Sequence, residues 1–334
     1  MGIINSAFAE REPSLFIIQT PFQAMCAINA IIQLRIEDYT LALHLHKKTE
    51  KRNRQTIELL ESNGLKYQVA EEQPISFFDR LSLFFNHRGE YNRVFLGTHL
   101  YQNGYYYALK ELRDGGNLVL LDDGAATVTL LNGDYKIKGR SRLRMAWNQL
   151  IASKCNIKIN NILTVYKDIG NPKWNIAFND ISRFRRGETP IVKKFVFFIG
   201  TNNSLFIDEF GVDEYVFQQV LCKVLGTVKM QYPLDEIIYI PHGRDRSTLA
   251  RDYCKDNGIE YKPLDVNVEF FILSLGIVPK AVFGFTSSAL YNLKRIYPES
   301  SVYNIAMRLL TDKDPGLLVV TDYYEKQGIP AILV

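Results

Sequence analysis

The fold is decided by a stretch near the start of the chain, Leu15-Phe16-Ile17-Ile18-Gln19-Thr20-Pro21-Phe22-Gln23. Its first four residues form an apolar run with the length of a buried strand, far shorter than a signal-peptide core or a membrane span. Pro21 suits the first turn of a helix, because the N–H that proline lacks would have no partner there. We therefore predict a strand that passes directly into a helix over Phe22–Leu34, the unit from which parallel sheets are built.

The same pattern recurs along the chain as a short apolar run, a polar turn and an amphipathic stretch. Two further helices are predicted where a glycine ends the periodic pattern, Thr56–Asn63 before Gly64 and Asp213–Leu225 before Gly226. Strands that alternate with helices indicate an α/β fold whose parallel sheets carry helices on both faces. The predicted strands are Leu15–Ile18, Leu41–Leu45, Arg93–Leu96, Leu118–Leu121, Phe195–Ile199, Ile237–Ile240 and Ala281–Phe285.

The 334 residues are enough for two domains of about 150 residues each. Strand signals thin out between Leu131 and Glu188, and a new apolar strand follows Thr189-Pro190. We therefore predict an N-terminal domain over residues 1–188 and a C-terminal domain over residues 189–334. Both are predicted to be doubly wound, Rossmann-like parallel sheets that face a central cleft, with ligands at the carboxyl ends of the strands.

The composition is that of a globular protein, because 47% of the residues are hydrophobic and 23% are charged. The net charge of +4 is too small to indicate a nucleic-acid partner. The cysteines lie far apart and form no CxxC pair, which predicts reduced thiols in a cytoplasmic protein. They are Cys26, Cys155, Cys222 and Cys254.

Basic residues gather in two segments that also carry aromatic side chains, Trp147 in the first and Phe184 in the second. Such a segment suits an anionic membrane surface or an anionic glycan. The alternative is the solvated face of an exposed helix or loop. The first segment contains Lys136, Lys138, Arg140, Arg142 and Arg144, and the second contains Arg183, Arg185, Arg186, Lys193 and Lys194.

Two turns that follow strands of the N-terminal half carry polar side chains. In the first, Thr20 and Pro21 precede Gln23 at a predicted helix start, whose free amides could hold an anion or a sugar hydroxyl. The alternative is that Thr20 only caps the helix. In the second, Asp122-Asp123-Gly124, the adjacent carboxylates could bind a divalent metal, orient a sugar or act as a base. The alternative is a simple turn with Gly124 in the left-handed region.

Two turns of the C-terminal half have side chains suited to phosphate. The first is Pro241-His242-Gly243-Arg244, where His242 and Arg244 could neutralise a phosphate and the histidine could protonate it as it leaves. The second carries Thr286, Ser287 and Ser288, whose hydroxyls at a helix start would join the backbone amides in a phosphate site. Helix capping is again the alternative for the second turn.

Motifs of several other enzyme classes are absent from the sequence. No GxGxxG follows the first strand, and no GxxxxGK(S/T), HExxH or GxSxG occurs. The chain therefore lacks the residues that mark dehydrogenases, P-loop NTPases, zinc proteases and esterases.

Taken in chain order, these segments resemble glycosyltransferase family 52, the bacterial lipooligosaccharide sialyltransferases, together with the related capsule polysialyltransferase-like proteins. The resemblance spans nearly the whole chain through short motifs. Gly243 stands where the family usually has proline, and Thr201-Asn202-Asn203 lacks the acid that some members carry there. The matching segments are Ile17–Gln23, Asp122–Gly124, Phe198–Gly200 with Asp208–Val212, His242–Arg244 and Ser287–Leu290.

The resemblance implies a GT-B architecture in which the N-terminal domain binds the acceptor and the C-terminal domain binds the nucleotide-sugar donor. It implies inverting transfer of sialic acid from CMP-sialic acid to a terminal sugar, with galactose expected, of a lipooligosaccharide or capsule. No metal or other cofactor is expected. Glu209 is the first choice for the base that deprotonates the acceptor hydroxyl, with Asp208, Asp122 and Asp123 left open.

The resemblance also implies a role for the phosphate-binding turns. His242 is expected to stabilise or protonate the leaving phosphate, while Arg244, Ser287 and Ser288 hold CMP. The expected catalytic residues are thus Glu209, His242 and Asp123. The expected substrate-binding residues are Thr20, Pro21, Gln23, Asp122, Gly124, Gly200, Asp208, Arg244, Thr286, Ser287 and Ser288.

We expect a cytoplasmic protein with no nucleic-acid partner. The sequence leaves open both peripheral association with the inner face of the membrane and a homodimer. One alternative is an enzyme of the same fold that uses a UDP-hexose, CMP-Kdo or another nonulosonic acid as donor. The other is a noncatalytic subunit of envelope assembly that binds a glycan or nucleotide.

Overall fold

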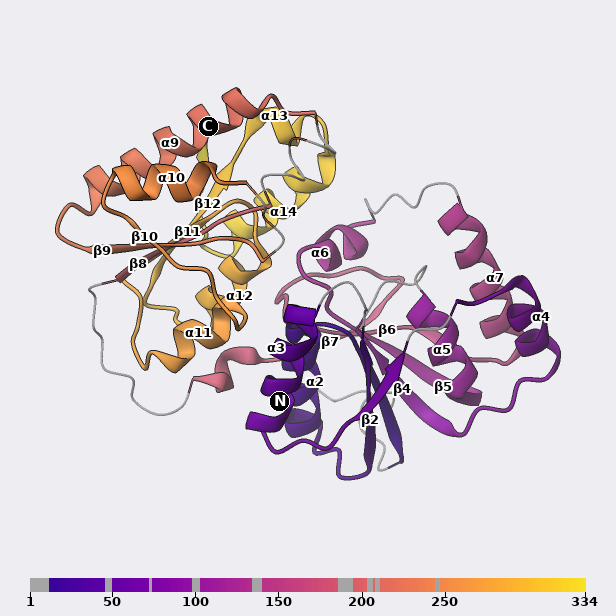
Figure 1. Cartoon of the computed structure of the whole chain (residues 1–334). Helices are drawn as coiled ribbons and strands as arrows, with labels where there is room; N and C mark the ends of the chain where they lie inside the picture. Colours follow the sequence, from indigo (N-terminus) through magenta and orange to yellow (C-terminus); the bar gives the residue numbers. More distant parts are fainter. Residues whose placement is uncertain are drawn as a thin grey trace. The chain divides into compact units, whose positions relative to one another are not determined.

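The computed structural model describes residues 12–45, 50–71, 74–97, 103–133, 140–185, 195–202, 207, 211–243, 245 and 247–334. The chain divides into two compact units, Met1–Asp180 and Ile181–Val334 (Figure 1). The division falls before the predicted boundary at residue 188. The 3-10 helix η1 (Ile181–Phe184) packs against α12 (Ser288–Ile296), and the Phe184 ring centroid lies 5.6 Å from that of Phe270. These contacts place η1 in the second unit.

The first unit is built on a seven-stranded sheet of parallel strands in the order β3-β2-β1-β4-β5-β6-β7. The strands are β1 (Ser14–Ile18), β2 (Tyr39–Leu45), β3 (Gln68–Glu71), β4 (Tyr91–Leu96), β5 (Leu112–Leu121), β6 (Lys158–Thr164) and β7 (Asn175–Phe178). The helices between them are α2 (Pro21–Leu34), α3 (Glu50–Ser62), α4 (Phe77–Phe85), α5 (Asn103–Glu111), α6 (Ala126–Leu131) and α7 (Arg140–Lys154).

The second unit has a six-stranded parallel sheet in the order β10-β9-β8-β11-β12-β13. The strands are β8 (Phe195–Ile199), β9 (Glu236–Ile240), β10 (Glu260–Tyr261), β11 (Ala281–Gly284), β12 (Ser301–Ala306) and β13 (Ala331–Leu333). The remaining helices are α9 (Glu214–Gln231), α10 (Leu249–Asp256), α11 (Val268–Ser274), α13 (Arg308–Thr311) and α14 (Pro315–Lys326). Figure 1 shows α9 and α10 on one face of this sheet and α11 and α12 on the other.

All seven predicted strands form, so the predicted class of doubly wound parallel α/β sheets is confirmed. The predicted end of α9 is wrong, because this helix continues through Gly226 to Gln231. Val228, beyond the glycine, is buried in the core of the second unit, and this burial outweighs the low helix propensity of glycine. Sequence reasoning also missed β3, β6, β7, β10, β12 and β13, of which β6 and β7 lie in the segment where strand signals are weak.

Both sheets have the same winding. In the first, the chain runs outward from β1 through β2 to β3 and then returns to place β4 on the other side of β1. In the second, it runs from β8 through β9 to β10 and returns to place β11 beside β8. Each sheet therefore has a switch point, between β1 and β4 and between β8 and β11, where ligands of open α/β sheets usually bind.

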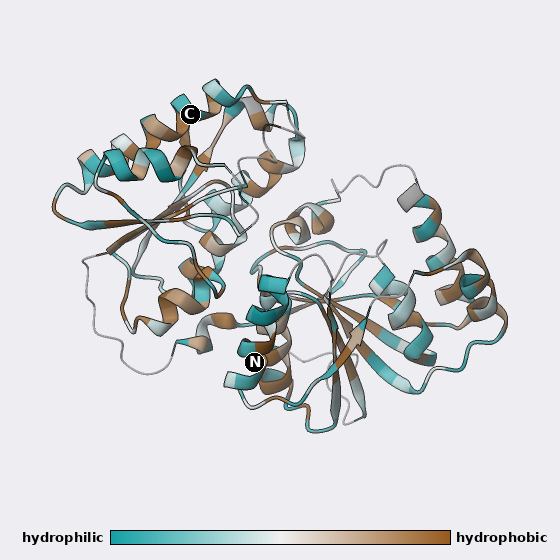
Figure 2. Cartoon of the chain, viewed as in Figure 1, coloured by the Kyte–Doolittle hydropathy of each residue, from teal (hydrophilic) through white to brown (hydrophobic). Residues whose placement is uncertain are grey.

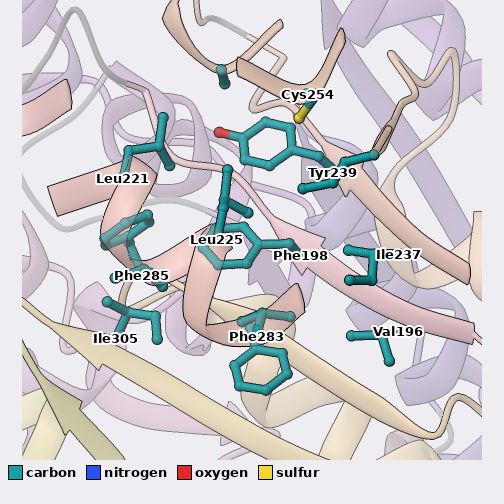
Figure 3. Packing of buried hydrophobic residues seen from close by; sticks show 14 of the residues in the cluster. Val196, Phe198, Leu221, Leu225, Ile237, Tyr239, Cys254, Phe283, Phe285 and Ile305 are labelled. Atoms are coloured by element: carbon teal, nitrogen blue, oxygen red, sulfur yellow. The ribbon is translucent and has the colours of Figure 1, made fainter. Parts of the chain in front are cut away.

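The core of the second unit explains why a glycine follows β8. Tyr239 is fully buried among apolar residues of β8, β9, α9 and α10, and its ring centroid lies 5.5 Å from that of Phe198 (Figure 3). Among the described residues, the Tyr239 hydroxyl finds no hydrogen-bond partner. A Cβ atom added at Gly200 would lie 2.5 Å from this hydroxyl oxygen, so only glycine fits without displacing the ring.

We expect Gly200→Ala to lower the free energy of unfolding by about 1–3 kcal/mol, because the new methyl group overlaps a packed aromatic side chain. Tyr239→Phe removes a buried hydroxyl that makes no hydrogen bond to the described part of the chain, so it should leave stability unchanged or raise it. The double variant should recover part of the loss. Urea unfolding followed by circular dichroism measures all three, and equal losses in the single and double alanine variants would contradict the packing argument.

Candidate functional site

The polar turns of the first unit meet at the carboxyl edge of its sheet. The turn after β1 carries Thr20 and Gln23, and the turn after β5 carries Asp122 and Asp123. Thr20 is the N-cap of α2, where its hydroxyl oxygen accepts a hydrogen bond from the Gln23 N–H at 3.2 Å. Pro21 occupies the first position of the helix and is buried. Thr20 thus takes the capping role that the sequence left as the alternative.

The Gln23 side chain joins these two turns. Its Oε1 accepts a hydrogen bond from the Gln19 backbone N–H at 2.8 Å, and its Nε2 donates one to Oδ1 of Asp123 at 3.1 Å. Gln23 is only 1% exposed, so it positions Asp123 and is not available to a large ligand. A Cβ atom added at Gly97, the residue after β4, would lie 2.7 Å from the Gln23 side chain. Sequence reasoning missed Gly97, although its place directly after a predicted strand was a usable signal.

Asp122 is fully buried beneath the same turn. Its Oδ1 accepts a hydrogen bond from the Thr164 hydroxyl at 2.6 Å, and its Oδ2 accepts one from the Val165 N–H at 2.7 Å. Burial raises the pKa of the Asp122 carboxyl to about 7, although these hydrogen bonds act in the opposite direction. A carboxyl group in this position cannot touch a substrate, so Asp122 holds the turn to β6 and is not a suitable base.

Asp123 and Gly124 lie at the surface, whereas Asp122 does not. Both are partly exposed, and Gly124 has a left-handed φ of 72°. The Asp123 N–H donates to the Thr127 hydroxyl at 3.2 Å, which fixes the turn to the start of α6. Of the two adjacent carboxylates, only Asp123 can therefore meet a ligand. The Asp123 carboxylate can accept a hydrogen bond from a sugar hydroxyl or take its proton.

The buried Asp122 should make the first unit less stable as pH rises. The unfolded chain releases this proton near the ordinary pKa of 3.8, whereas the folded protein releases it near 7. Between these values the folded state binds the extra proton, so its stabilising effect is complete below about pH 4 and is lost as pH rises through 7. The slope reaches about 1.4 kcal/mol per pH unit for one proton.

Asp122→Asn removes this titration, so the stability of the wild type relative to the variant should fall between about pH 4 and 7. Urea midpoints measured across this range test the expectation. Asp38→Asn, which changes an exposed carboxylate at the opposite edge of the sheet, serves as the control and should follow the wild type. A constant difference between wild type and Asp122→Asn at every pH would contradict the assignment.

In the second unit, the turn between β11 and α12 has a strained backbone. Thr286 has a φ of 41°, a left-handed conformation that β-branched residues rarely adopt. Its N–H donates to Oδ1 of Asn304 at 2.8 Å, and the fully buried Asn304 donates from Nδ2 to the Thr321 hydroxyl at 3.3 Å. Sequence reasoning missed Asn304, because nothing in the order of residues links β12 to this turn. Strain of this kind, held by buried partners, is typical of functional sites.

The hydroxyl residues of this turn lie at the switch point of the second sheet, between the strand and the helix that the sequence predicted. Ser287 is the N-cap of α12 and accepts a hydrogen bond from the Ala289 N–H at 3.3 Å. The Tyr324 hydroxyl donates to the Ser287 carbonyl oxygen at 3.0 Å and fixes the cap from α14. Thr286, Ser287 and Ser288 are all partly exposed. They offer hydroxyl groups beside the positive end of a helix dipole.

The turn after β9 opens beside a cavity. His242 is exposed, and its carbonyl oxygen accepts a hydrogen bond from the Asp245 N–H at 2.9 Å. The cavity has a volume of about 730 Å³ and is lined by the β9–α10 loop, by Arg251 and Lys255 of α10, and by Tyr261. Its size is that of a small-molecule site, and its walls combine two cations, the Asp245 carboxylate, hydroxyl groups and an aromatic ring.

Three predicted site residues, Asp208, Glu209 and Arg244, lie outside the described residues. Their expected roles stay predictions. The described part of the chain holds one group of three close His, Cys, Asp or Glu side chains, which consists of His87, Asp114 and Cys155. Asp114 lies near the amino-terminal end of β5, at the opposite end of that strand from Asp123. A metal at Asp122 and Asp123 therefore gains no further donor of these types from the described residues.

Comparison with known proteins shows which solved structures share this fold. No protein-family model and no curated protein matches the sequence. A solved structure described as a UDP-N-acetylglucosamine 2-epimerase from Listeria monocytogenes matches with a TM-score of 0.53 and 9% identity, over 96% of this chain and 89% of that chain. The structure of S. aureus MnaA with UDP matches with a TM-score of 0.50 and 10% identity, over 88% and 79%. At these identities the likeness concerns the fold alone.

The chain thus has the fold class that the sequence predicted, the GT-B type with two doubly wound parallel sheets. In the ranges that the structure describes, no helix is long and apolar enough to cross a bilayer.

Proposed function

We propose that this chain is an inverting glycosyltransferase that uses a nucleotide-activated sugar, with CMP-sialic acid as the favoured donor and a terminal sugar of a bacterial surface glycan as acceptor. The strained turn at Thr286 carries the proposal. A buried asparagine maintains an unfavourable backbone conformation that leaves three hydroxyl residues at the switch point of the second sheet. Such an arrangement suits a phosphate group.

The donor would bind to the second unit. Ser287 and Ser288, at the start of α12, would hold the phosphate of the nucleotide, and His242 and Arg244 would neutralise it. The cavity beside the β9–α10 loop would take the nucleoside, with Tyr261 offering an aromatic face. The preference for a CMP-linked donor comes from the sequence resemblance to glycosyltransferase family 52.

The acceptor would bind to the first unit, where Gln23 holds the partly exposed Asp123 carboxylate at the sheet edge. We assign to Asp123 the orientation of the acceptor sugar and to Glu209 the removal of its proton. In the transfer step the acceptor oxygen forms a bond to the anomeric carbon, and the bond between that carbon and the phosphate oxygen breaks. The hydroxyl proton passes to the carboxylate, and His242 donates to the departing phosphate.

Donor choice is tested by thermal unfolding with added nucleotides. Because only a ligand that prefers the folded state raises Tm, CMP should raise it and UDP should not at the same concentration. A rise with UDP alone would favour an enzyme that uses a UDP-hexose. The direct assay is incubation with CMP-sialic acid and galactose-terminated acceptors, without added metal, followed by detection of CMP release and sialylated product.

The proposed roles predict different kinetic effects. His242→Ala and Glu209→Gln should each lower kcat by about a hundred- to ten-thousand-fold, as expected for lost acid–base groups. Asp123→Asn should chiefly raise the KM for the acceptor, because it removes an orienting contact. Asp38→Asn is the matched control and should keep full activity. If CMP binds but the wild type turns over no acceptor, the chain is better regarded as a noncatalytic binding subunit. If the wild type is active and none of the three site variants differs from it, the assigned roles are wrong.

A further inference from the structure

Helix α4 presents its aromatic residues to solvent and buries its arginine. Its register is fixed by a capping box, in which the Ser76 hydroxyl accepts from the Asp79 N–H at 3.1 Å and Asp79 accepts from the Ser76 N–H at 2.7 Å. Arg80 is only 8% exposed, and its guanidinium donates to Oδ1 of Asn148 at 2.8 Å. By contrast, Phe77, Phe78 and Phe85 are 63%, 76% and 66% exposed. These are the only phenylalanines in the described ranges that are classed as exposed.

Helix α7 lies beside α4 and extends this apolar surface (Figure 1). Its Leu143 and Leu150 are also exposed, at 74% and 48%. Trp147 joins the two helices, because its ring centroid lies 5.9 Å from that of Phe77 and 5.9 Å from that of Phe84. We call the surface formed by Phe77, Phe78, Phe85, Leu143 and Leu150 the α4–α7 face. Figure 2 shows the hydrophobic residues along α4 in brown.

Basic side chains border most of the α4–α7 face, and Asp79 in the first turn of α4 is an acidic exception. Helix α7 contains three arginines and one lysine, and it contains no acidic residue. Arg142, Arg144 and Lys154 are exposed, and the Lys154 ammonium lies 4.3 Å from the ring centroid of Phe84 and 5.4 Å from that of Phe85. Burial lowers the pKa of the Arg80 guanidinium, and the positive charge of Arg144 lowers it further. Cations therefore crowd together beside exposed aromatic rings.

We propose that the α4–α7 face docks on the surface of a bilayer that contains anionic lipids. Exposed aromatic and aliphatic side chains on a helix, bordered by arginine and lysine, are the features of helices that lie in the membrane interface. The anionic headgroups neutralise the crowded cations while the phenyl rings enter the acyl boundary. The first basic segment of the sequence thus continues into this face through Arg142 and Arg144, whereas Lys136 and Lys138 lie outside the described residues.

The charges favour a lipid surface over a second copy of the chain. A two-fold dimer would place the α4–α7 face against itself and bring the cations of α7 close to those of the partner copy. A bilayer with anionic headgroups removes this repulsion. The inference does not depend on the proposed transferase activity, because the contacts that carry it lie in α4 and α7 and include none of the proposed site residues.

Vesicle binding tests the proposal. The sequence has two tryptophans, so Trp174→Phe leaves Trp147 as the only fluorescent indole, next to Phe77. We expect this protein to sediment with vesicles of phosphatidylcholine mixed with phosphatidylglycerol, and its emission to shift to shorter wavelength. Added salt should weaken the binding, because part of it is electrostatic. Vesicles of phosphatidylcholine alone should bind at least about tenfold more weakly.

Substitutions test whether vesicles bind to the α4–α7 face or to another part of the surface. In the full-length chain, Phe77→Ser/Phe78→Ser/Phe85→Ser should lower vesicle affinity by about tenfold or more. The matched control, Val69→Ser/Met230→Ser/Leu234→Ser, removes three exposed apolar residues elsewhere and should bind as the wild type does. Arg144→Glu should also weaken binding, whereas Lys223→Glu, on the exposed face of α9, should not.

Three results would overturn the proposal. The first is equal binding to neutral and anionic vesicles, and the second is unchanged binding in both the phenylalanine triple variant and Arg144→Glu. The third is a dimer that the triple variant dissociates, in a protein that does not bind vesicles, as judged by analytical ultracentrifugation. Thermal unfolding with and without CMP shows that each variant still folds, and it separates loss of docking from loss of the proposed donor site.

Discussion

Parallel pairing of every strand in both sheets is the constraint on which the rest of the structure depends. It brings the carboxyl ends of all strands in a unit to one edge, so turns distant in sequence become neighbours. The hydrogen bond between Gln23 and Asp123 spans 100 residues of sequence for this reason. The doubly wound order adds a switch point, where strands are added on both sides of the first strand of the sheet. In the second unit the hydroxyl residues after β11 lie at this point, and in the first unit Asp123 follows β5, the next strand beyond β4.

Buried polar side chains fix the turns at both edges. In the first unit, Asp122 is held by Thr164 and Val165, and in the second, Asn304 holds the strained N–H of Thr286. Burying a polar group is costly unless its partners are present, so each of these contacts selects one arrangement of the turn. These contacts therefore hold the exposed neighbouring residues in fixed positions. The neighbours are Asp123 in the first unit and the hydroxyl residues in the second.

Helix α4 reverses the usual distribution of side chains, because a charged side chain is buried and phenyl rings are exposed. Arg80 satisfies its burial through Asn148 and through the ring of Tyr106, which lies 5.4 Å from the guanidinium carbon. An exposed aromatic surface is costly in water and is usually retained where something covers it. The α4–α7 face includes none of the residues of the strand-end turns, so docking and chemistry would use different residues of the first unit.

The sequence by itself determined the class of the fold, the seven apolar strands and the turns where polar residues follow them. Short-range patterns suffice for these features, because the apolar run of a strand and the capping residues of a helix are neighbours in the sequence. Only the tertiary structure decided that Asp122 is buried while Asp123 is exposed, that Gly97 and Asn304 support the site, and that Gly226 lies inside α9. These outcomes depend on packing between segments far apart in the chain, which no local pattern records. Strands β6 and β7 escaped prediction for the same reason, since polar residues such as Asn161 and Asn175 satisfy each other across the sheet and need no apolar run.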